Sequence, residues 1–138
     1  MATVRDIMTA DVTCVGENET ISAAAHKMAG LNVGSLPICG ADDRLKGMVT
    51  DRDIVVKVLA KDLDPGKVTA GELGGRETIT IGADDDLAEV LSTMATHKVR
   101  RRPVIDGHRL VGIVAVADVA RALPDRPVGD LIDAISES

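Results

Sequence analysis

The sequence contains no phenylalanine, tyrosine or tryptophan among its 138 residues. Its hydrophobic core must therefore be built from valine, isoleucine, leucine, methionine and alanine. Base stacking on aromatic rings, the usual means of holding single-stranded nucleic acid, is excluded. A formal net charge of −6 further argues against a nucleic-acid or anionic-membrane surface. We therefore expect neither nucleic acid nor a membrane as a partner.

Long apolar runs and a targeting segment are also missing. No apolar stretch approaches the roughly 20 residues of a membrane-spanning helix. Residues 1–6 lack a basic region followed by an apolar core, so no signal peptide is visible. We therefore expect a cytoplasmic protein of about one domain's length. A chain of this size can stabilise its core without disulfide bonds or bound metal ions.

Cysteine is scarce: only Cys14 and Cys39 occur, and neither lies in a C-x-x-C pair, which argues against redox catalysis or a zinc ribbon. Without a signal peptide, reduced thiols are the default. Each cysteine nevertheless ends a predicted strand, and parallel neighbouring strands lie about 4.8 Å apart, within disulfide reach. The sequence leaves both reduced thiols and a Cys14–Cys39 disulfide open. A disulfide would indicate an oxidising compartment and export without a signal peptide.

Catalytic motifs are absent as well. The sequence has no phosphate-binding G-x-x-x-x-G-K, no G-x-G-x-x-G and no G-x-S-x-G. His26, His97 and His108 form no i, i+4 pair, and there is no H-E-x-x-H. We expect a protein that is not an enzyme. The one metal hypothesis is a zinc site shared across a dimer interface, for which His97 and His108 are weak candidate ligands.

An internal repeat runs nearly end to end. Pairs at an offset of 66 residues include Ile7 with Leu73, Gly16 with Gly82, Ile21 with Leu87, Met28 with Met94, Val33 with Val99 and Pro37 with Pro103. Pairs at an offset of 65 follow: Leu45 with Leu110, Gly47 with Gly112, Val49 with Val114, Asp53 with Asp118 and Ile54 with Val119. The chain therefore consists of two like halves.

Apolar spacing predicts the order β-α-β-β-α in each half. The first half has strands at 12–15, 36–39 and 45–49 and helices at 20–30 and 51–59; the second has strands at 78–81, 102–105 and 110–115 and helices at 84–97 and 116–123. Asp84, Asp85 and Asp86 crowd a helix start, and we interpret them as a cap rather than a metal site.

The repeat gives domain boundaries of 4–62 and 68–126, with Pro65-Gly66 between them. Residues 127–138 are expected to form a short helix packed on the module, because their apolar side chains share one face. These side chains are Val128, Leu131, Ile132 and Ile135.

The segment 47–53, Gly-Met-Val-Thr-Asp-Arg-Asp, joins a strand to a helix. Thr50 is a natural N-cap and Asp53 follows three residues later, which is the pattern of a capping box. The same geometry suits a ligand. A helix N-terminus attracts phosphate, a hydroxyl adds a donor, and a carboxylate one turn away can accept from a ribose diol. The spacing alone leaves both interpretations open.

These features together resemble the CBS domain: paired β-α-β-β-α halves, Pro37-Ile38 and Pro103-Val104 in the central strands, and the segment 47–53. The resemblance covers about residues 4–127. It implies an α/β (α+β) fold in which tandem CBS domains pack with pseudo-twofold symmetry as a Bateman module. It also implies a homodimer and adenosine-containing ligands such as AMP, ATP or S-adenosylmethionine in clefts between the domains.

The family's site pattern carries over to the first half residue by residue. It implies that Thr50 contacts phosphate and that Asp53 holds the ribose hydroxyls. By the same resemblance, the residues that border the base would be Thr13, Cys14, Pro37 and Ile38.

The second half departs from this pattern. Asp118 is present, but Ala115 stands where the hydroxyl should be. Arg101 and Arg102, with Arg100, could compensate at a cleft edge, or could form a solvated or acid-paired basic strip. We therefore predict at most one competent nucleotide cleft, the one with Thr50 and Asp53.

Two hypotheses for the function follow. The first is a stand-alone regulatory or sensory module that binds an adenosine ligand in a stress context such as hypoxia. The second is a dimeric interaction scaffold that keeps the fold without binding nucleotide. The residues identify no protein partner.

Overall fold

The computed structural model describes residues 2–10, 12–74 and 79–122. Its contacts divide the chain into two compact units. We call residues 13–78 the first unit, and residues 1–12 together with 79–138 the second unit. No helix in the described parts has the length and apolar character to cross a bilayer.

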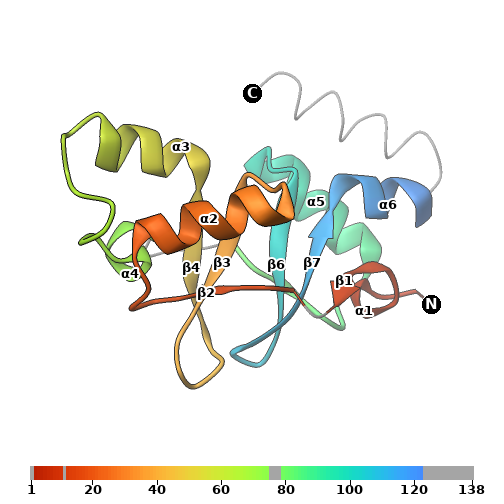
Figure 1. Cartoon of the computed structure of the whole chain (residues 1–138). Coiled ribbons are helices and arrows are strands. Elements are labelled where there is room, and N and C mark those ends of the chain that lie inside the picture. The colour runs from red at the N-terminus through yellow and green to blue at the C-terminus, as the bar shows by residue number, and fades with distance from the viewer. Residues whose placement is uncertain (1, 11, 75–78, 123–138) are drawn as a thin grey trace. The chain divides into compact units, whose positions relative to one another are not determined.

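The first unit is a three-stranded sheet with helices (Figure 1). Strand β3 is central, parallel to β2 and antiparallel to β4. Its elements are β2 (Val15–Gly16), α2 (Ile21–Leu31), β3 (Ser35–Cys39), β4 (Leu45–Thr50), α3 (Asp51–Ile54), the π-helical turn η1 (Val55–Leu59) and α4 (Ala70–Leu73).

The core of this unit follows from its apolar spacing. Helix α2 buries Ile21, Ala24 and Met28, which recur at intervals of three and four residues. Strand residues, α3, η1 and α4 complete the cluster. Its other members are Val15, Leu36, Ile38, Val49, Ile54, Val58, Ala70 and Leu73.

The second unit is a four-stranded sheet in the order β1-β7-β6-β5. Strands β5 and β6 are parallel, and β7 is antiparallel to both β6 and β1. Its elements are α1 (Val4–Ile7), β1 (Thr9–Ala10), β5 (Ile81–Gly82), α5 (Leu87–His97), β6 (Arg101–Asp106), β7 (Arg109–Ala115) and α6 (Val116–Ala122). Helix α5 buries Leu87, Val90 and Met94 against this sheet's core cluster.

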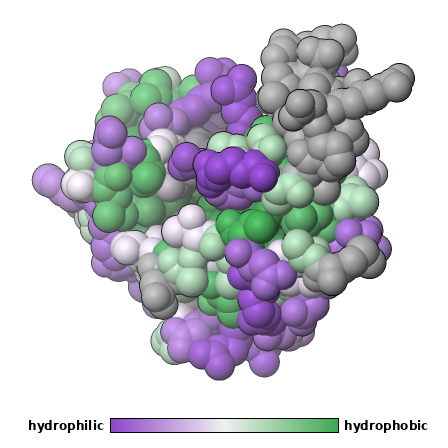
Figure 2. Space-filling view, turned by 90° about the vertical axis from the view of Figure 1, so that its right-hand side faces the viewer, coloured by the Kyte–Doolittle hydropathy of each residue, from purple (hydrophilic) through white to green (hydrophobic). Residues whose placement is uncertain are grey.

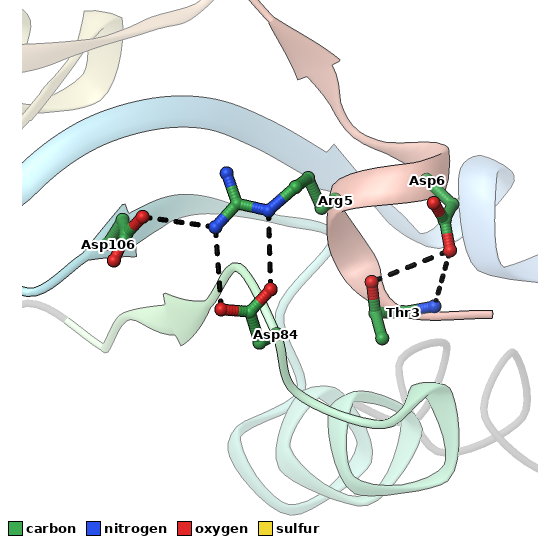
Figure 3. A network of polar contacts seen from close by, with 5 residues as sticks. All are labelled: Thr3, Arg5, Asp6, Asp84 and Asp106. Carbon is green, nitrogen blue, oxygen red and sulfur yellow. Dashed lines mark hydrogen bonds and ion pairs between the residues drawn. The ribbon is translucent and has the colours of Figure 1, made fainter. Parts of the chain in front are cut away.

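The N-terminal segment is built into the second unit. Strand β1 adds to the edge of β7, and Val4 is fully buried in the core there (Figure 1). Arg5 donates from Nε to Asp84 at 3.2 Å and from Nη2 to Asp106 at 3.0 Å, which ties α1 to the turn before α5 and to the end of β6 (Figure 3).

The close approach of β1 to β7 depends on a glycine. A Cβ on Gly112 would lie 2.7 Å from the Thr9 carbonyl oxygen, nearer than real Cβ contacts come. Residue 112 therefore has to lack a side chain for the N-terminal strand to pair here.

The structure confirms the predicted fold class and the β-α-β-β-α order of each half. The predicted parallel pairing of the first two strands is also correct. Two features escaped the sequence analysis. Residues 4–10 form ordered elements on the second unit, and α4, which opens the second sequence repeat, packs into the core of the first unit. The expected C-terminal helix, 127–138, lies outside the described residues.

Candidate functional site

Thr50 and Asp53 form a complete capping box at the start of α3. The Asp53 backbone N–H donates to Thr50 Oγ1, and the Thr50 N–H donates to Asp53 Oδ2, both at 3.0 Å. Thr50 is extended at φ −115°, ψ 160°, as an N-cap should be. The prediction that Thr50 and Asp53 form a capping box is therefore confirmed.

The side chains of Thr50 and Asp53 keep hydrogen-bonding capacity beyond the capping box. Because Thr50 Oγ1 accepts in the cap, its own O–H remains a donor. Asp53 Oδ1 lies 3.2 Å from Lys57 Nζ, in an i, i+4 pair whose lysine is half exposed. A carboxylate oxygen accepts more than one hydrogen bond, so this site can still offer a donor and an acceptor side by side.

The residues predicted to border a base lie on neighbouring strands. Ser35 is opposite Thr50, and Pro37 is opposite Met48. Ile38, however, is fully buried, and its Cδ1 fills the place that a Cβ on Gly74 would take. Ile38 therefore offers no exposed atom to a ligand, and its predicted place at the border of a base does not fit the structure of this unit.

Two more predicted residues precede β2 in the same unit. Thr13 is exposed and Cys14 is partly buried. Neither takes part in the capping box at Thr50.

The corresponding site of the second unit keeps half of the box. The Ala115 N–H donates to Asp118 Oδ2 at 2.8 Å, but residue 115 has no hydroxyl to accept in return. Arg121 Nη2 donates to Asp118 Oδ1 at 2.7 Å. The second site therefore has its acid already paired and lacks the donor.

Restoring the missing hydroxyl is expected to stabilise the protein. Ala115→Thr should raise the free energy of unfolding by about 1 kcal/mol, because a threonine N-cap satisfies a helix N–H that alanine leaves open. Urea denaturation measures this. A control at the exposed first residue of β6, Arg101→Thr, should give no comparable gain. A loss of stability in Ala115→Thr would contradict the equivalence of the two sites.

The three consecutive arginines differ in their surroundings. Arg100 and Arg101 are exposed, whereas Arg102 is partly buried. Burial lowers the pKa of Arg102. The Nε of Arg102 is buried with no hydrogen-bond partner. The predicted solvated strip thus fits two of the three arginines.

Both cysteines are free thiols in the structure. Cys39 ends β3 and is buried, at 7% exposed. Burial, and then a hydrogen bond with the Cys14 thiol, raise the pKa of Cys39 to about 12. Cys39 is therefore protonated at neutral pH and a poor nucleophile.

The raised pKa of Cys39 predicts a pH-dependent stability. The unfolded chain releases this thiol proton near pH 9, whereas the folded chain holds it until about pH 12. Above pH 9 the unfolded state therefore binds fewer protons, and the free energy of unfolding falls, by at most about 1.4 kcal/mol per pH unit. Urea unfolding between pH 7 and pH 10.5 should show this fall in the wild type and a shallower one in Cys39→Val. Identical slopes would contradict it.

The acidic run before α5 is explained by local structure. Asp86 caps α5 by accepting from the Ala88 N–H, Asp85 accepts from the Gly82 N–H, and Asp84 pairs with Arg5. The expected helix cap is confirmed for Asp86, whereas Asp84 and Asp85 bond to residues outside α5.

The histidines are dispersed. His97 ends α5 and His108 lies in the turn after β6, both exposed. Strand β6, whose six residues span about 20 Å, lies between them in the chain. Within the described ranges no three His, Cys, Asp or Glu side chains come together as metal ligands. The described residues therefore do not by themselves fit a zinc ion, which usually takes four ligands.

The structure adds groups that the sequence analysis passed over. Lys57 and Arg121 each pair with the acid of their half, and the i, i+4 and i, i+3 spacings could have indicated this. An open recess of about 480 Å³ on the first unit is lined by residues distant in sequence, five polar ones and a glycine. They are Glu17, Asn18, Lys46, Thr69, Gly71 and Glu72.

Comparison with known proteins identifies relatives over both halves. The family model described as CBS domain matches residues 4–60 and 70–125. Hypoxic response protein 1 of Mycobacterium tuberculosis is 55% identical over 135 residues, which covers 98% of this chain and 94% of the relative.

Solved structures agree with these relatives. The crystal structure of Hypoxic Response Protein I with two coordinated zinc ions has a TM-score of 0.81 and 58% identity, covering 89% of this chain and all of that one. The structure of CBSX2 in complex with AMP has a TM-score of 0.76 and 26% identity, covering 88% and 96% of the two chains.

Proposed function

The chain belongs to the CBS-domain family through both of its halves, and from that premise we propose that it is a non-enzymatic regulatory module that binds an adenosine-containing ligand at Thr50 and Asp53. Candidate ligands are AMP, ATP and S-adenosylmethionine. The relationship to Hypoxic response protein 1 supports a stress context such as hypoxia. The complex of CBSX2 with AMP supports the ligand class.

One observation carries the proposal: the capping box leaves the Thr50 O–H free to donate beside a carboxylate that can still accept. The hydroxyl would donate to a phosphoryl oxygen, and Asp53 would accept from the ribose hydroxyls. Among the residues that the structure describes, the cation paired with Asp53 is Lys57, whose side chain is half exposed. Because an exposed ion pair contributes little, the ligand would displace it at small cost.

The regulatory step would be a shift of population. A ligand that binds one conformation more tightly than another favours that conformation by its difference in affinity. A partner surface would respond to that shift.

Isothermal titration calorimetry with AMP, ATP and S-adenosylmethionine tests the proposal. We expect saturable heat for at least one of them with the wild-type chain. Absence of heat from all three compounds at millimolar concentration would overturn the proposal that the protein binds an adenosine ligand.

A second candidate function, a homodimeric interaction scaffold without a ligand, is favoured by exposed apolar side chains on the first unit. Val55, Val56 and Leu59 of η1 are 55%, 43% and 52% exposed, and Leu31 and Leu63 are 48% and 47% exposed. Hydrophobic residues also reach the surface between hydrophilic ones on the face displayed in Figure 2. Exposed apolar surface of this kind marks contact sites.

We expect a second copy of the chain to cover η1, whichever function holds. Sedimentation velocity should give a dimer for the wild type and a monomer for Leu59→Glu, with Ala41→Glu, at an exposed position in the turn between β3 and β4, as the charge-matched control. An unchanged sedimentation coefficient in Leu59→Glu would place the dimer contact elsewhere.

A further inference from the structure

Helix α1 packs on the second unit in the same way as helix α4 packs on the first. The Arg5 N–H of α1 donates to the Ala83 carbonyl at 2.8 Å, and the Gly71 N–H of α4 donates to the Glu17 carbonyl at 2.9 Å. The repeat offset of 66 residues pairs Arg5 with Gly71. The same offset pairs their two carbonyl partners. Residues 5 and 71 are therefore equivalent in structure as well as in sequence.

The two equivalent positions differ in what fills the space beside them. In the second unit the guanidinium of Arg5 lies between two acids, with Nε 3.2 Å from Asp84 and Nη2 3.0 Å from Asp106 (Figure 3). In the first unit Gly71 has no side chain, and a Cβ there would lie 2.8 Å from the Glu17 carbonyl oxygen. Residue 71 therefore supplies no cation of its own.

The first unit is hollowed where this side chain is missing. Gly71 lines the open recess of about 480 Å³, together with Glu17 beside it and Glu72 after it. That volume lies in the range of small-molecule sites in proteins. The recess belongs wholly to the first unit.

Two carboxylates of the recess have capacity for a cation. Within residues 2–10, 12–74 and 79–122, no ion pair engages Glu17 or Glu72. Glu72 Oε2 accepts from the Thr69 N–H at 2.9 Å, but a carboxylate accepts several hydrogen bonds. A guanidinium matches carboxylate oxygens with its planar fork of donors, as Arg5 shows in the second unit.

The recess also has groups suited to an anion. Lys46 Nζ lies 3.5 Å from Asp42, in an i, i+4 pair whose two side chains are 38% and 50% exposed. An exposed pair of this kind contributes little, so the ammonium can turn to a ligand at small cost. Asn18 is exposed and adds an amide. A molecule with a cation at one end and a carboxylate at the other fits this lining.

We propose that the recess is a binding site for a small guanidinium-bearing amino acid, with arginine as its representative. The guanidinium contacts Glu17 and Glu72, in the place that Arg5 fills in the second unit, and the α-carboxylate contacts Lys46. The site is independent of the proposed adenosine function. Lys46 precedes Thr50 by four residues, about 13 Å along β4, so the two sites lie at opposite ends of this strand.

The test follows backbone amide resonances of the full chain during titration with arginine, at constant pH and ionic strength. Citrulline, which keeps the length and loses the charge, is the matched probe, and agmatine lacks the carboxylate. The variants are Glu17→Gln, Glu72→Gln and Lys46→Gln, with Glu89→Gln at an exposed position of α5 as the control. Glutamine keeps the cap at residue 72, because glutamine also serves in a capping box.

We expect arginine to give saturable shifts that are largest at Glu17, Asn18, Gly71 and Glu72, and citrulline to give none. Each glutamate variant should bind arginine about threefold more weakly and the double variant about tenfold, because each loses one solvent-accessible ion pair. Glu89→Gln should match wild type. Resonances away from the recess that keep their wild-type positions show that each variant is folded.

The carboxylate contact has a test of its own. Lys46→Gln should bind arginine about threefold more weakly and agmatine at least as tightly as wild type, because only arginine has a carboxylate to lose its partner. An equal loss for both compounds would overturn the placement of the α-carboxylate.

Three outcomes would overturn the site itself. They are the absence of saturable shifts at tens of millimolar arginine, equal shifts with citrulline, and unchanged arginine affinity in the double glutamate variant. The tripeptide Gly-Arg-Gly separates a free amino acid from an arginine of a protein partner. If the tripeptide shifts the four amides and arginine does not, the recess accepts a protein side chain and the proposal of a free amino acid fails.

Discussion

Thr50→Val protein is expected to keep its fold and to lose its response to an adenosine ligand. The substitution removes the only group at this helix start that both caps α3 and retains a free O–H. Loss of the cap should cost about 1 kcal/mol of the free energy of unfolding. Loss of the donor to a phosphoryl oxygen should weaken binding by about tenfold or more, because hydrogen bonds to charged groups are the strong ones.

A second capping box in the same unit gives the matched control. Thr69 caps the four-residue helix α4 with Glu72, as Thr50 caps the four-residue helix α3 with Asp53. Thr69→Val should lose a similar amount of stability and keep ligand affinity. The ligand-induced rise in melting temperature, measured for both variants, separates the two effects. An equal rise in Thr50→Val and wild type would place the ligand away from Thr50, and no rise in either would leave only the scaffold function.

Val4→Asp is expected to unfold the second unit before the first, although residue 4 lies at the opposite end of the chain from most of that unit. Val4 is fully buried among the side chains of α5, β6, β7 and α6. Burying a carboxylate there without a partner should cost about 3–5 kcal/mol, a large part of the stability of a domain.

Amide hydrogen exchange locates this effect. Protection should fall in α5, β6 and β7 and persist in α2, β3 and β4, because Val4 belongs to the core cluster of the second unit and those three elements belong to the cluster of the first. Ala2→Asp, at an exposed position two residues away, should leave both patterns intact. Loss of protection confined to the first unit would contradict the observed packing of the N-terminal segment.

The repeat made most of the fold predictable. The apolar spacing of Ile21, Ala24 and Met28 fixes the buried face of α2, and the equivalent residues do the same for α5. The prolines and glycines at constant offsets located the central strands. These signals are local, so they can be found without knowledge of tertiary contacts.

The packing of the short segments could not be predicted in the same way. Residues 4–10 and 70–73 are too short for a periodic pattern, and their partners lie far away in the sequence. Strand β1 pairs with β7 across about 100 residues of chain, and the close approach at Gly112 is visible only once the strands are placed.

For the candidate site, the sequence supplied residues but not their environments. The capping box at Thr50 followed from spacing alone. The burial of Ile38 beneath α4 and the unpartnered Nε of Arg102 depend on tertiary packing. Arg102 nevertheless occupies the repeat position of Leu36, and this can be read from the sequence. A charged residue at the position of a core leucine is a signal that could have been used.

The central claim, that an adenosine ligand binds at the start of α3, is tested most directly by following backbone amide resonances during a titration with AMP. The account predicts saturable shifts that are largest at Thr50, Asp51, Arg52 and Asp53. Saturable shifts that leave these four amides unmoved, or a spectrum that does not change at millimolar AMP, ATP and S-adenosylmethionine, would contradict it.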